Sequence, residues 1–256
     1  MEEKWLIEVE KIAIKAGILI TEHLKGGPKV TRKGAVDLVT DADIMSEKYI
    51  VAEIQKHFPG HSILAEESGG DEDGHFVWAI DPIDGTTNYA HGFPVFAVSI
   101  GLLVDRQPVL GVVYDPNLKE LFSAVKGGGA TLNGETIQVS DVADLNDSLL
   151  ATGFPYTLRE NYKTIMADFT RLSLLCQGVR RAGAASLDLC ALACGRFDGF
   201  WEVGLRPWDT AAAGLVVEEA GGKLSKYDGS EFDHFKRGLI ASNSLIHDLL
   251  LEQLAE

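Results

Sequence analysis

The chain is poor in cysteine, and this shortage limits its class. Three cysteines occur in 256 residues, and no two have the CxxC spacing of a redox or zinc motif. Cys190 and Cys194 lie four residues apart among alanines and leucines, which is typical of buried thiols on a helix. A disulfide-stapled extracellular fold is therefore not expected. The cysteine usage suits a reducing compartment, and we expect a cytoplasmic location.

Positive charge is also scarce. Lysine and arginine together number 23 against 38 acidic residues, so the formal net charge is −15. A general nucleic-acid binder needs a basic face, and we therefore expect no nucleic-acid partner. The negative charge does not exclude an anionic small substrate, because bound divalent cations would reverse the sign of the charge at a site.

Long apolar runs and low-complexity linkers are missing as well. No segment has the length and hydropathy of a membrane span, and no signal-peptide pattern follows the charged start, so no membrane partner is expected. Apolar residues make up 46% of the chain, which allows a substantial core. A soft boundary near 142–147 predicts an α+β half (1–145) and an α/β half (146–256). Without a Gly/Pro/Ser-rich linker, the halves should pack closely as one catalytic unit.

Apolar spacing and turn residues predict alternating helices and strands. Helices are expected over 4–25, 42–58, 161–176, 186–195, 207–220 and from 244 onward. Strands are expected over 62–65, 76–80, 96–104, 109–114, 120–125, 135–139, 198–202, 223–226 and 239–241. Segment 30–40 is expected to be a strand or a mobile loop. Residues 127–129 and Asn133-Gly134 are expected to be turns.

The most informative segment is Asp81-Pro82-Ile83-Asp84-Gly85-Thr86-Thr87. An apolar, β-prone stretch precedes it and should deliver the two acids to the end of a buried strand. Carboxylates are costly to bury unless they are paired or bound to metal. If the chain turns at Pro82-Ile83, both carboxylates and the Ile83 carbonyl face one cavity. The N–H groups that follow could then begin a helix and bind a phosphate.

Glu66 and Asp209 add acids at the expected ends of other elements. Oxygen ligands favour Mg²⁺ or Mn²⁺ over Zn²⁺. Two cations about 3.5–4 Å apart can activate a water and stabilise the leaving oxygen of an in-line displacement. Asp209 alone would be a helix N-cap, and it can serve as both cap and ligand.

Three segments together resemble the inositol monophosphatase family, a Mg²⁺-dependent, lithium-sensitive phosphatase group, over nearly the whole chain. They are Glu66-Glu67-Ser68, the run from Trp78 to Asn88, and the run from Pro207 to Gly214 followed by 218–222. The resemblance implies an α+β/α/β fold, the layered αβαβα sandwich of the inositol monophosphatase and fructose-1,6-bisphosphatase type. It also implies a homodimer.

The resemblance further implies roles for individual residues. Glu66, Asp81 and the Ile83 carbonyl would hold a first metal ion, Asp81, Asp84 and Asp209 a second, and a weaker third ion would share Glu66. Thr86, hydrogen-bonded to Asp43, would orient the attacking water, with Glu66 also in the catalytic group. The implied substrate contacts are Asp84, Gly85, Thr86, Gly183, Ala185, Glu202, Arg206 and Asp209. Lys33 would lie in a mobile loop.

Some assignments stay open at this point. Asp41 competes with Asp43 for the supporting role, and Asp43 could simply cap the second helix. Arg180-Arg181 could be a phosphate-binding patch or a salt-bridged helix start. Glu67 is expected to be a surface residue or a neighbour of the metal ligands, and not a metal ligand itself. His91 and Trp208 are expected to be structural.

The implied activity is Mg²⁺-dependent hydrolysis of inositol monophosphate, with fructose 1,6-bisphosphate as a possible second substrate. Alternative substrates are 3′-phosphoadenosine 5′-phosphate, NADP and histidinol phosphate. The chain lacks large insertions, which favours a compact pocket for a small phosphorylated polyol or sugar. A non-enzymatic alternative is a binding partner of the transcription machinery.

Overall fold

The structure is a computed structural model that describes residues 2–32 and 38–254. Its helices are α1 (Glu2–Leu24), α2 (Asp41–His57), α3 (Thr86–Ala90), α4 (Leu158–Ser173), α5 (Ala185–Ala193), α6 (Pro207–Glu219) and α7 (His247–Leu254), with a 3₁₀ turn at Leu145–Asp147. The strands of the first half are β1 (Val30–Arg32), β2 (Leu38–Thr40), β3 (Ser62–Ala65), β4 (Gly69–Gly70), β5 (Phe76–Asp84), β6 (Ala97–Val104), β7 (Gln107–Asp115), β8 (Glu120–Val125), β9 (Gly129–Leu132) and β10 (Glu135–Thr136). Those of the second half are β11 (Leu149–Thr152), β12 (Gly178–Arg180), β13 (Gly199–Glu202), β14 (Lys223–Ser225) and β15 (Leu239–Ser242).

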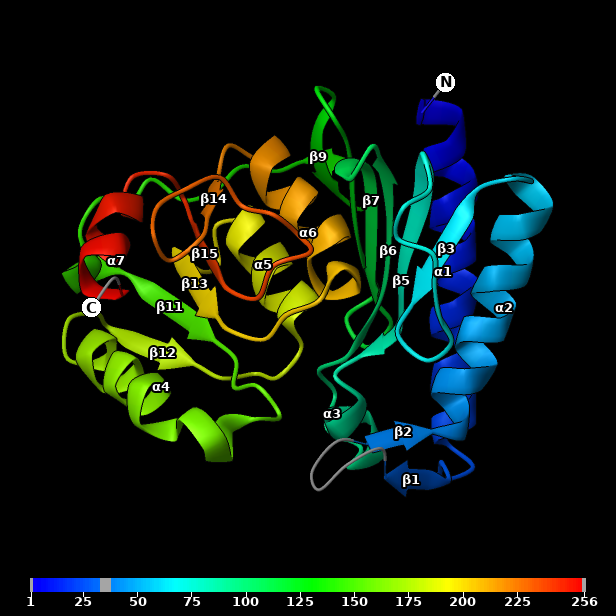
Figure 1. Ribbon diagram of the computed structural model, residues 1–256, viewed down its shortest axis with the longest axis horizontal. Coiled ribbons are helices and arrows are strands. Elements are labelled where there is room, and N and C mark those ends of the chain that lie inside the picture. Colours follow the sequence, from blue (N-terminus) through cyan, green and yellow to red (C-terminus); the bar gives the residue numbers. More distant parts are fainter. Residues whose placement is uncertain (1, 33–37, 255–256) are drawn as a thin grey trace.

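The elements form five alternating layers, as Figure 1 shows. Helices α1 and α2 cover one face of an eight-stranded sheet ordered β10-β9-β8-β7-β6-β5-β3-β4. Helices α5 and α6 lie between this sheet and a five-stranded sheet ordered β12-β11-β13-β15-β14. Helices α4 and α7 pack on the outer side of the second sheet. The expected αβαβα sandwich is confirmed.

Helix α6 lies unusually close to the first sheet because two strand residues have no side chain. A Cβ atom at Gly101 on β6 would lie 2.9 Å from the Ala211 Cβ, and one at Gly111 on β7 would lie 2.5 Å from the Ala212 carbonyl oxygen. The glycines and the small residues of α6 therefore allow a close approach of helix to sheet. This packing fixes the start of α6, where Asp209 lies.

Most expected elements are present, and the boundaries of several differ. The strand expected over 76–80 continues to Asp84, so the acids lie within a strand and not after it. The strand expected over 135–139 pairs only at Glu135–Thr136, and β9 begins at Gly129, inside the expected glycine turn. Strands β4, β9, β11 and β12 were not expected. Segment 30–40 contains β1 and β2 on either side of 33–37, so Lys33 lies outside the described residues.

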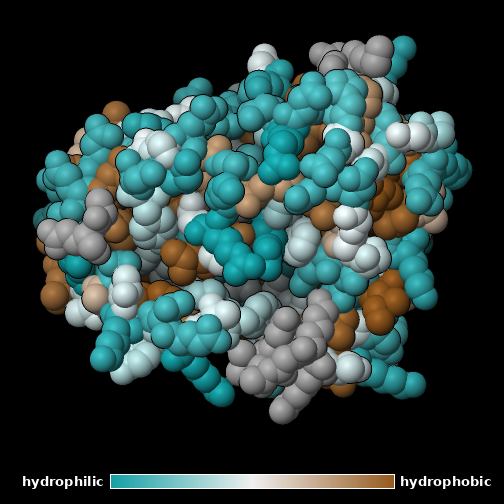
Figure 2. Space-filling view, viewed as in Figure 1, coloured by the Kyte–Doolittle hydropathy of each residue, from teal (hydrophilic) through white to brown (hydrophobic). Residues whose placement is uncertain are grey.

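The surface agrees with the acidic composition. The face in Figure 2 is mostly hydrophilic, with apolar groups in small separate areas. Among the described residues, none of the helices is both long and apolar enough to cross a membrane. Cys190 is buried and Cys194 partly buried, and neither is in a disulfide.

Candidate active site

A β-bulge in β5 positions the two central acids. Strand β5 pairs antiparallel with β6, but the register shifts between Asp81, opposite Ser99, and Asp84, opposite Ala97. A bulge redirects side chains that regular alternation would place differently. The Ile83 N–H donates to Asp81 Oδ1 at 3.0 Å, and the Ser46 hydroxyl donates to the Pro82 carbonyl at 3.2 Å. The expected change of direction at Pro82-Ile83 is therefore a bulge held from both sides.

Asp84 is joined to the beginning of α5. Its Oδ2 accepts hydrogen bonds from the Ser186 N–H at 2.7 Å and from the Ser186 hydroxyl at 2.5 Å. The Asn88 side chain donates to the carbonyl oxygens of Val95 at 2.8 Å and Ala182 at 2.9 Å. The segment around Asp84 is thus tied to the segment that contains Gly183 and Ala185.

Glu66 follows β3 and lies beside the cavity described below. Its N–H donates to the Ile80 carbonyl at 3.1 Å. The buried carboxylate of Glu47 on α2 accepts from the N–H groups of Glu67 at 2.8 Å and Ser68 at 3.0 Å. Glu47 therefore fixes the turn that carries Glu66, a role that the sequence did not reveal.

Asp209 stands at the third position of α6 and faces the cavity; the N-cap is Arg206, so the expected N-cap position of Asp209 is wrong, although its side chain completes the capping box. Its Oδ2 accepts from the Arg206 N–H at 2.7 Å, and its own N–H donates to the Arg206 carbonyl at 3.1 Å. Pro207 stands at the first position of the helix, where its missing N–H costs nothing. The second carboxylate oxygen is not needed for the cap, so capping and ligation are compatible.

Thr86 contacts Asp43 and not Asp41. The Thr86 hydroxyl lies 3.1 Å from Asp43 Oδ1 and 3.1 Å from the Ile83 carbonyl oxygen. Asp43 Oδ2 accepts from the Thr40 N–H at 2.8 Å and from the Thr40 hydroxyl at 2.6 Å, which completes the capping box of α2. Asp41 lies elsewhere and accepts from the Lys29 N–H.

Gly85 allows the close turn between β5 and α3. Its φ is +93°, in the left-handed region that favours glycine, and a Cβ would lie 2.8 Å from the Val95 carbonyl oxygen. Gly85 is the N-cap of α3, and its carbonyl accepts from the Tyr89 N–H at 3.0 Å. The first N–H groups of α3 have no partner within the helix, which suits an anion.

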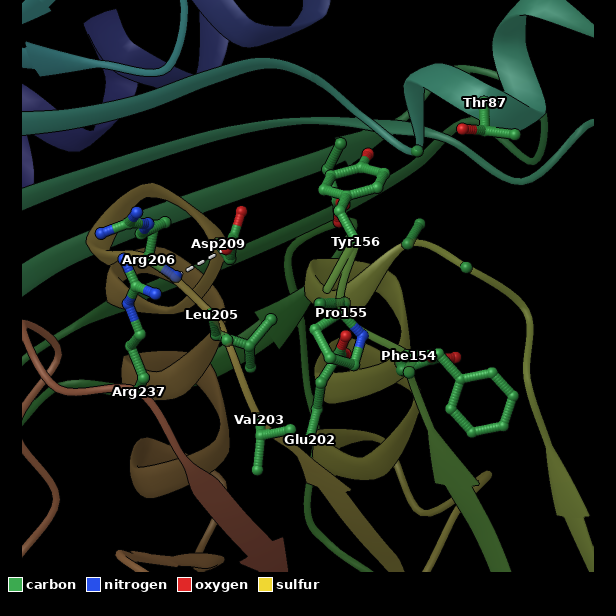
Figure 3. A pocket seen from close by; sticks show the side chains of 18 of the residues that line it. Thr87, Phe154, Pro155, Tyr156, Glu202, Val203, Leu205, Arg206, Asp209 and Arg237 are labelled. Carbon is green, nitrogen blue, oxygen red and sulfur yellow. Dashed lines mark hydrogen bonds between the residues drawn. The ribbon is translucent and has the colours of Figure 1, made fainter. Parts of the chain in front are cut away.

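These elements surround a cavity of about 460 Å³. The expected site residues on its wall are Glu66, Asp84, Gly85, Gly183, Ala185, Glu202, Arg206 and Asp209. Asp81, Ile83, Thr86 and Asp43 are buried behind that wall. Figure 3 shows Asp209, Arg206 and Arg237 on one side of the cavity and Phe154 across it.

The cavity also contains residues that sequence reasoning missed. They are Phe154, Tyr156, Arg181, Asp188 and Arg237. Arg181 was noted only as part of an ambiguous pair. Arg180 ends β12, so the helix-start alternative for that pair is wrong, and Arg181 lies at the edge of the cavity. His91 is the C-cap of α3, and Trp208, which was expected to be structural, lies on the cavity wall.

The acids affect one another electrostatically. Burial raises the pKa of Asp81 well above its usual value, and the charges of Glu66, Asp84, Asp209 and Asp43 raise it further. Burial and the neighbouring Asp84 and Glu66 likewise raise the pKa of Asp209, against the opposing Arg206 hydrogen bond. Burial raises the pKa of Asp84 despite the hydrogen bonds from Ser186. A divalent cation would remove this repulsion and favour the ionised acids.

The donor set fits a Mg²⁺-type ion that keeps part of its shell. Across 2–32 and 38–254, no group of three or more acidic, histidine or cysteine side chains is arranged so that it could hold a metal ion by itself. Magnesium does not require one, because it is usually bound by one or two carboxylates together with waters and substrate phosphate oxygens. Ile83 and the four carboxylates offer only oxygen, the hard donor that this ion prefers.

Acids from two layers of the fold thus share one cavity, an arrangement suited to metal-assisted hydrolysis. The family model of the inositol monophosphatase family matches residues 1–256. The chain belongs to the inositol monophosphatase family, which is metal-dependent.

Named relatives agree with this assignment. The chain is 48% identical to the inositol-1-monophosphatase of Synechocystis over 99% of this chain and 89% of the relative. It is 40% identical to the Nus factor SuhB of Escherichia coli over 96% of this chain and 94% of the relative. The solved inositol monophosphatase of Anabaena superposes with a TM-score of 0.91 at 46% identity, covering 98% and 95% of the two chains.

Proposed function

We propose that this phosphomonoesterase hydrolyses inositol monophosphate to inositol and phosphate in a Mg²⁺-dependent reaction. The observation that carries the proposal is the convergence of Glu66, Asp84 and Asp209 on one cavity beside the N-terminus of α3. The printed names of the Synechocystis and Anabaena relatives support the substrate class.

The residues divide the work in the proposed reaction. Glu66, Asp81, Asp84, Asp209 and the Ile83 carbonyl would hold two to three Mg²⁺ ions, for which Mn²⁺ can substitute. When bound, these ions lower the pKa of a water and neutralise charge on the phosphate and the leaving oxygen. The N–H groups of Gly85 and Thr86 would bind phosphate oxygens.

Thr86 and Asp43 are proposed to position the attacking water. A threonine hydroxyl that donates to a carboxylate keeps its lone pairs free to accept from a water. Asp43 is itself fixed through Thr40, so the Thr86 hydroxyl has a defined direction. A water that donates a hydrogen bond to the Thr86 hydroxyl is thereby oriented for attack on the phosphate. The Thr86 oxygen, which itself donates to Asp43, accepts the proton of that water.

Glu202, Ala185, Gly183 and Arg206 are proposed to contact the alcohol portion of the substrate. All four lie on the cavity wall. Burial and the nearby Asp188 and Asp84 raise the pKa of Glu202 to about 8, whereas Arg181 lowers it. A carboxyl group with such a pKa is largely protonated at neutral pH, so it can both donate a hydrogen bond to a hydroxyl group and accept one from it.

A second candidate substrate is a bisphosphate such as fructose 1,6-bisphosphate. Arg181, Arg206 and Arg237 lie around the cavity, and arginine is well suited to a phosphate group. Figure 3 shows Arg206 and Arg237 on the side of the cavity that also carries Asp209. This pair could receive a second phosphate.

One assay ranks these substrates. The purified chain is tested with Mg²⁺ or with EDTA on inositol 1-phosphate, fructose 1,6-bisphosphate, 3′-phosphoadenosine 5′-phosphate, NADP and histidinol phosphate at matched concentrations. We expect Mg²⁺-dependent phosphate release that is highest with inositol 1-phosphate. A tenfold preference for the adenosine bisphosphate would overturn this ranking, and no release from any substrate would overturn the proposed activity.

Two further proposals concern assembly. We propose that residues 1–145 and 146–256 act as one catalytic unit, since a hydrogen bond joins Asp84 of the first part to Ser186 of the second. We also propose that the chain forms a homodimer and is located in the cytoplasm. The alternative of a binding role in transcription draws on the relatives named Nus factor SuhB. A pull-down with Asp84→Asn as bait would favour that alternative if it captured RNA polymerase subunits.

A further inference from the structure

Asp188 is a buried acid for which the described part of the chain shows no structural role. It lies on α5 and is 2% exposed. Its Oδ2 atom is buried and has no hydrogen-bond partner among the described residues. Burying such a group without partners is costly, and native structures contain few of them. Asp188 therefore calls for a partner that is not part of the protein.

The position of Asp188 indicates where that partner binds. Asp188 lines the cavity that contains Asp84 and Asp209, and Glu202 lines it as well. The Glu202 carboxyl packs directly against the backbone of Gly153, since a Cβ there would lie 1.9 Å from Oε2. The absence of a side chain at Gly153 gives Glu202 its place, so two carboxyl groups border the region that the alcohol portion of a substrate would occupy.

The charge balance selects the kind of partner. Burial raises the pKa of Asp188 well above its usual value, the charge of Asp84 raises it further, and Arg181 opposes this change. A hydroxyl group can donate to a carboxylate and accept from a carboxylic acid, so it satisfies Asp188 in either state. A second phosphate would meet two acidic groups there, and an apolar group would leave the carboxyl unpaired.

We propose that Asp188 is a specificity-determining residue that, together with Glu202, recognises a hydroxyl group on the alcohol portion of the substrate, directly or through one ordered water. The inference rests on the proposed phosphomonoesterase function and narrows its substrates to polyol phosphates. Asp188 would be a binding residue for the alcohol, separate from the groups that act on phosphate.

The test compares two substrates that differ in hydroxyl groups. Inositol 1-phosphate has several on its alcohol portion, and 4-nitrophenyl phosphate has none. The ratio of their kcat/KM values is measured with Mg²⁺ for the unchanged chain, Asp188→Ala and Asp188→Asn. Losing a hydrogen bond to a charged group should lower the ratio at least about tenfold in Asp188→Ala. Asp188→Asn, which still has an acceptor, should recover part of it.

Thermal stability separates this role from a structural one. Removing a buried acid without partners should leave the Tm of Asp188→Ala equal to or above that of the unchanged chain. Asp115→Asn is the matched control. Asp115 ends β7, is also buried and does not line the cavity, but its carboxylate accepts hydrogen bonds from the N–H groups of Asn117 and Leu118. This control should leave the substrate ratio unchanged.

Two results would overturn the inference. One is a ratio in Asp188→Ala within about twofold of the unchanged chain, since one lost hydrogen bond is worth more than that. The other is a parallel loss on both substrates together with a lower Tm, which would make Asp188 structural. If Asp188→Ala does not fold, the same criteria apply to Asp188→Leu, which also lacks an acceptor. Failure of the proposed function is distinguishable, because the unchanged chain would then hydrolyse neither substrate.

Discussion

At the scale of single residues, Asp43 combines a structural and a proposed catalytic role. One oxygen of its carboxylate completes the capping box of α2, and the other lies 3.1 Å from the Thr86 hydroxyl. The helix cap thus fixes the direction of the group that acts on Thr86. The family resemblance implied Asp43 for this role, with Asp41 as a competing residue two positions away. The two are distinguished by the contact between Asp43 and Thr86, which lie 43 positions apart in the sequence.

Replacing the Thr86 hydroxyl should slow the chemical step. Thr86→Val keeps the shape of the side chain but removes the acceptor for the attacking water, so we expect kcat to fall on the order of 10²–10⁴-fold. KM should change little, because phosphate is proposed to bind through backbone N–H groups. Steady-state kinetics with inositol 1-phosphate measure both constants. The control is Thr21→Val in α1, whose hydroxyl donates to the Gly17 carbonyl. An equal kcat in both variants would contradict the role of Thr86.

At the scale of elements, local signals predicted most of the helices and the longer strands. The apolar runs of β6, β7 and β8 follow from residues adjacent in sequence. Strands β9 and β12 could not be predicted this way, since each is short and exists through pairing with a neighbouring strand. The same reason explains the cavity residues that were missed. Phe154, Asp188 and Arg237 belong to no shared motif, and only the folded chain brings them together.

The segment before β15 is joined to α6 through a buried histidine. His234 Nδ1 lies 2.9 Å from the Thr210 hydroxyl, and burial lowers the pKa of His234 to about 4. The unfolded chain binds a proton near pH 6.5, whereas the folded chain resists it until about pH 4. Between these pH values this histidine binds more protons in the unfolded state than in the folded state. Its contribution to the free energy of unfolding therefore falls as the pH falls.

The pH dependence of unfolding tests this contact. We expect His234→Gln to be less stable than the unchanged chain at pH 7, and this difference in the free energy of unfolding to shrink between pH 6.5 and 4, by at most about 1.4 kcal/mol per pH unit. Urea unfolding at several pH values measures both chains, and the buried acids of the cavity, whose raised pKa values act in the opposite direction, are the same in the two chains. His75→Gln, at an exposed histidine, serves as the control. Equal slopes for His234→Gln and the unchanged chain would contradict the account.

At the scale of the whole molecule, the layers bring acids from distant parts of the sequence to one place. Glu66 and Asp84 come from the eight-stranded sheet, and Asp209 comes from the helix packed on its other face. Hydrogen bonds from Ser186 hold Asp84 against the start of α5. The sequence motifs predicted this set because the family resemblance relates all three segments. The cavity wall that selects the alcohol depends on the packing of the second sheet, which no single motif describes.

The central claim is that the carboxylates form a Mg²⁺-dependent phosphatase site, and Asp84→Asn tests it most directly. The substitution keeps an acceptor for Ser186, so Tm and circular dichroism should stay close to those of the unchanged chain. It removes the charge that would hold an ion, so Mg²⁺-dependent release of phosphate from inositol 1-phosphate should fall by on the order of 10³-fold or more. A folded Asp84→Asn variant with full Mg²⁺-dependent activity would contradict the account.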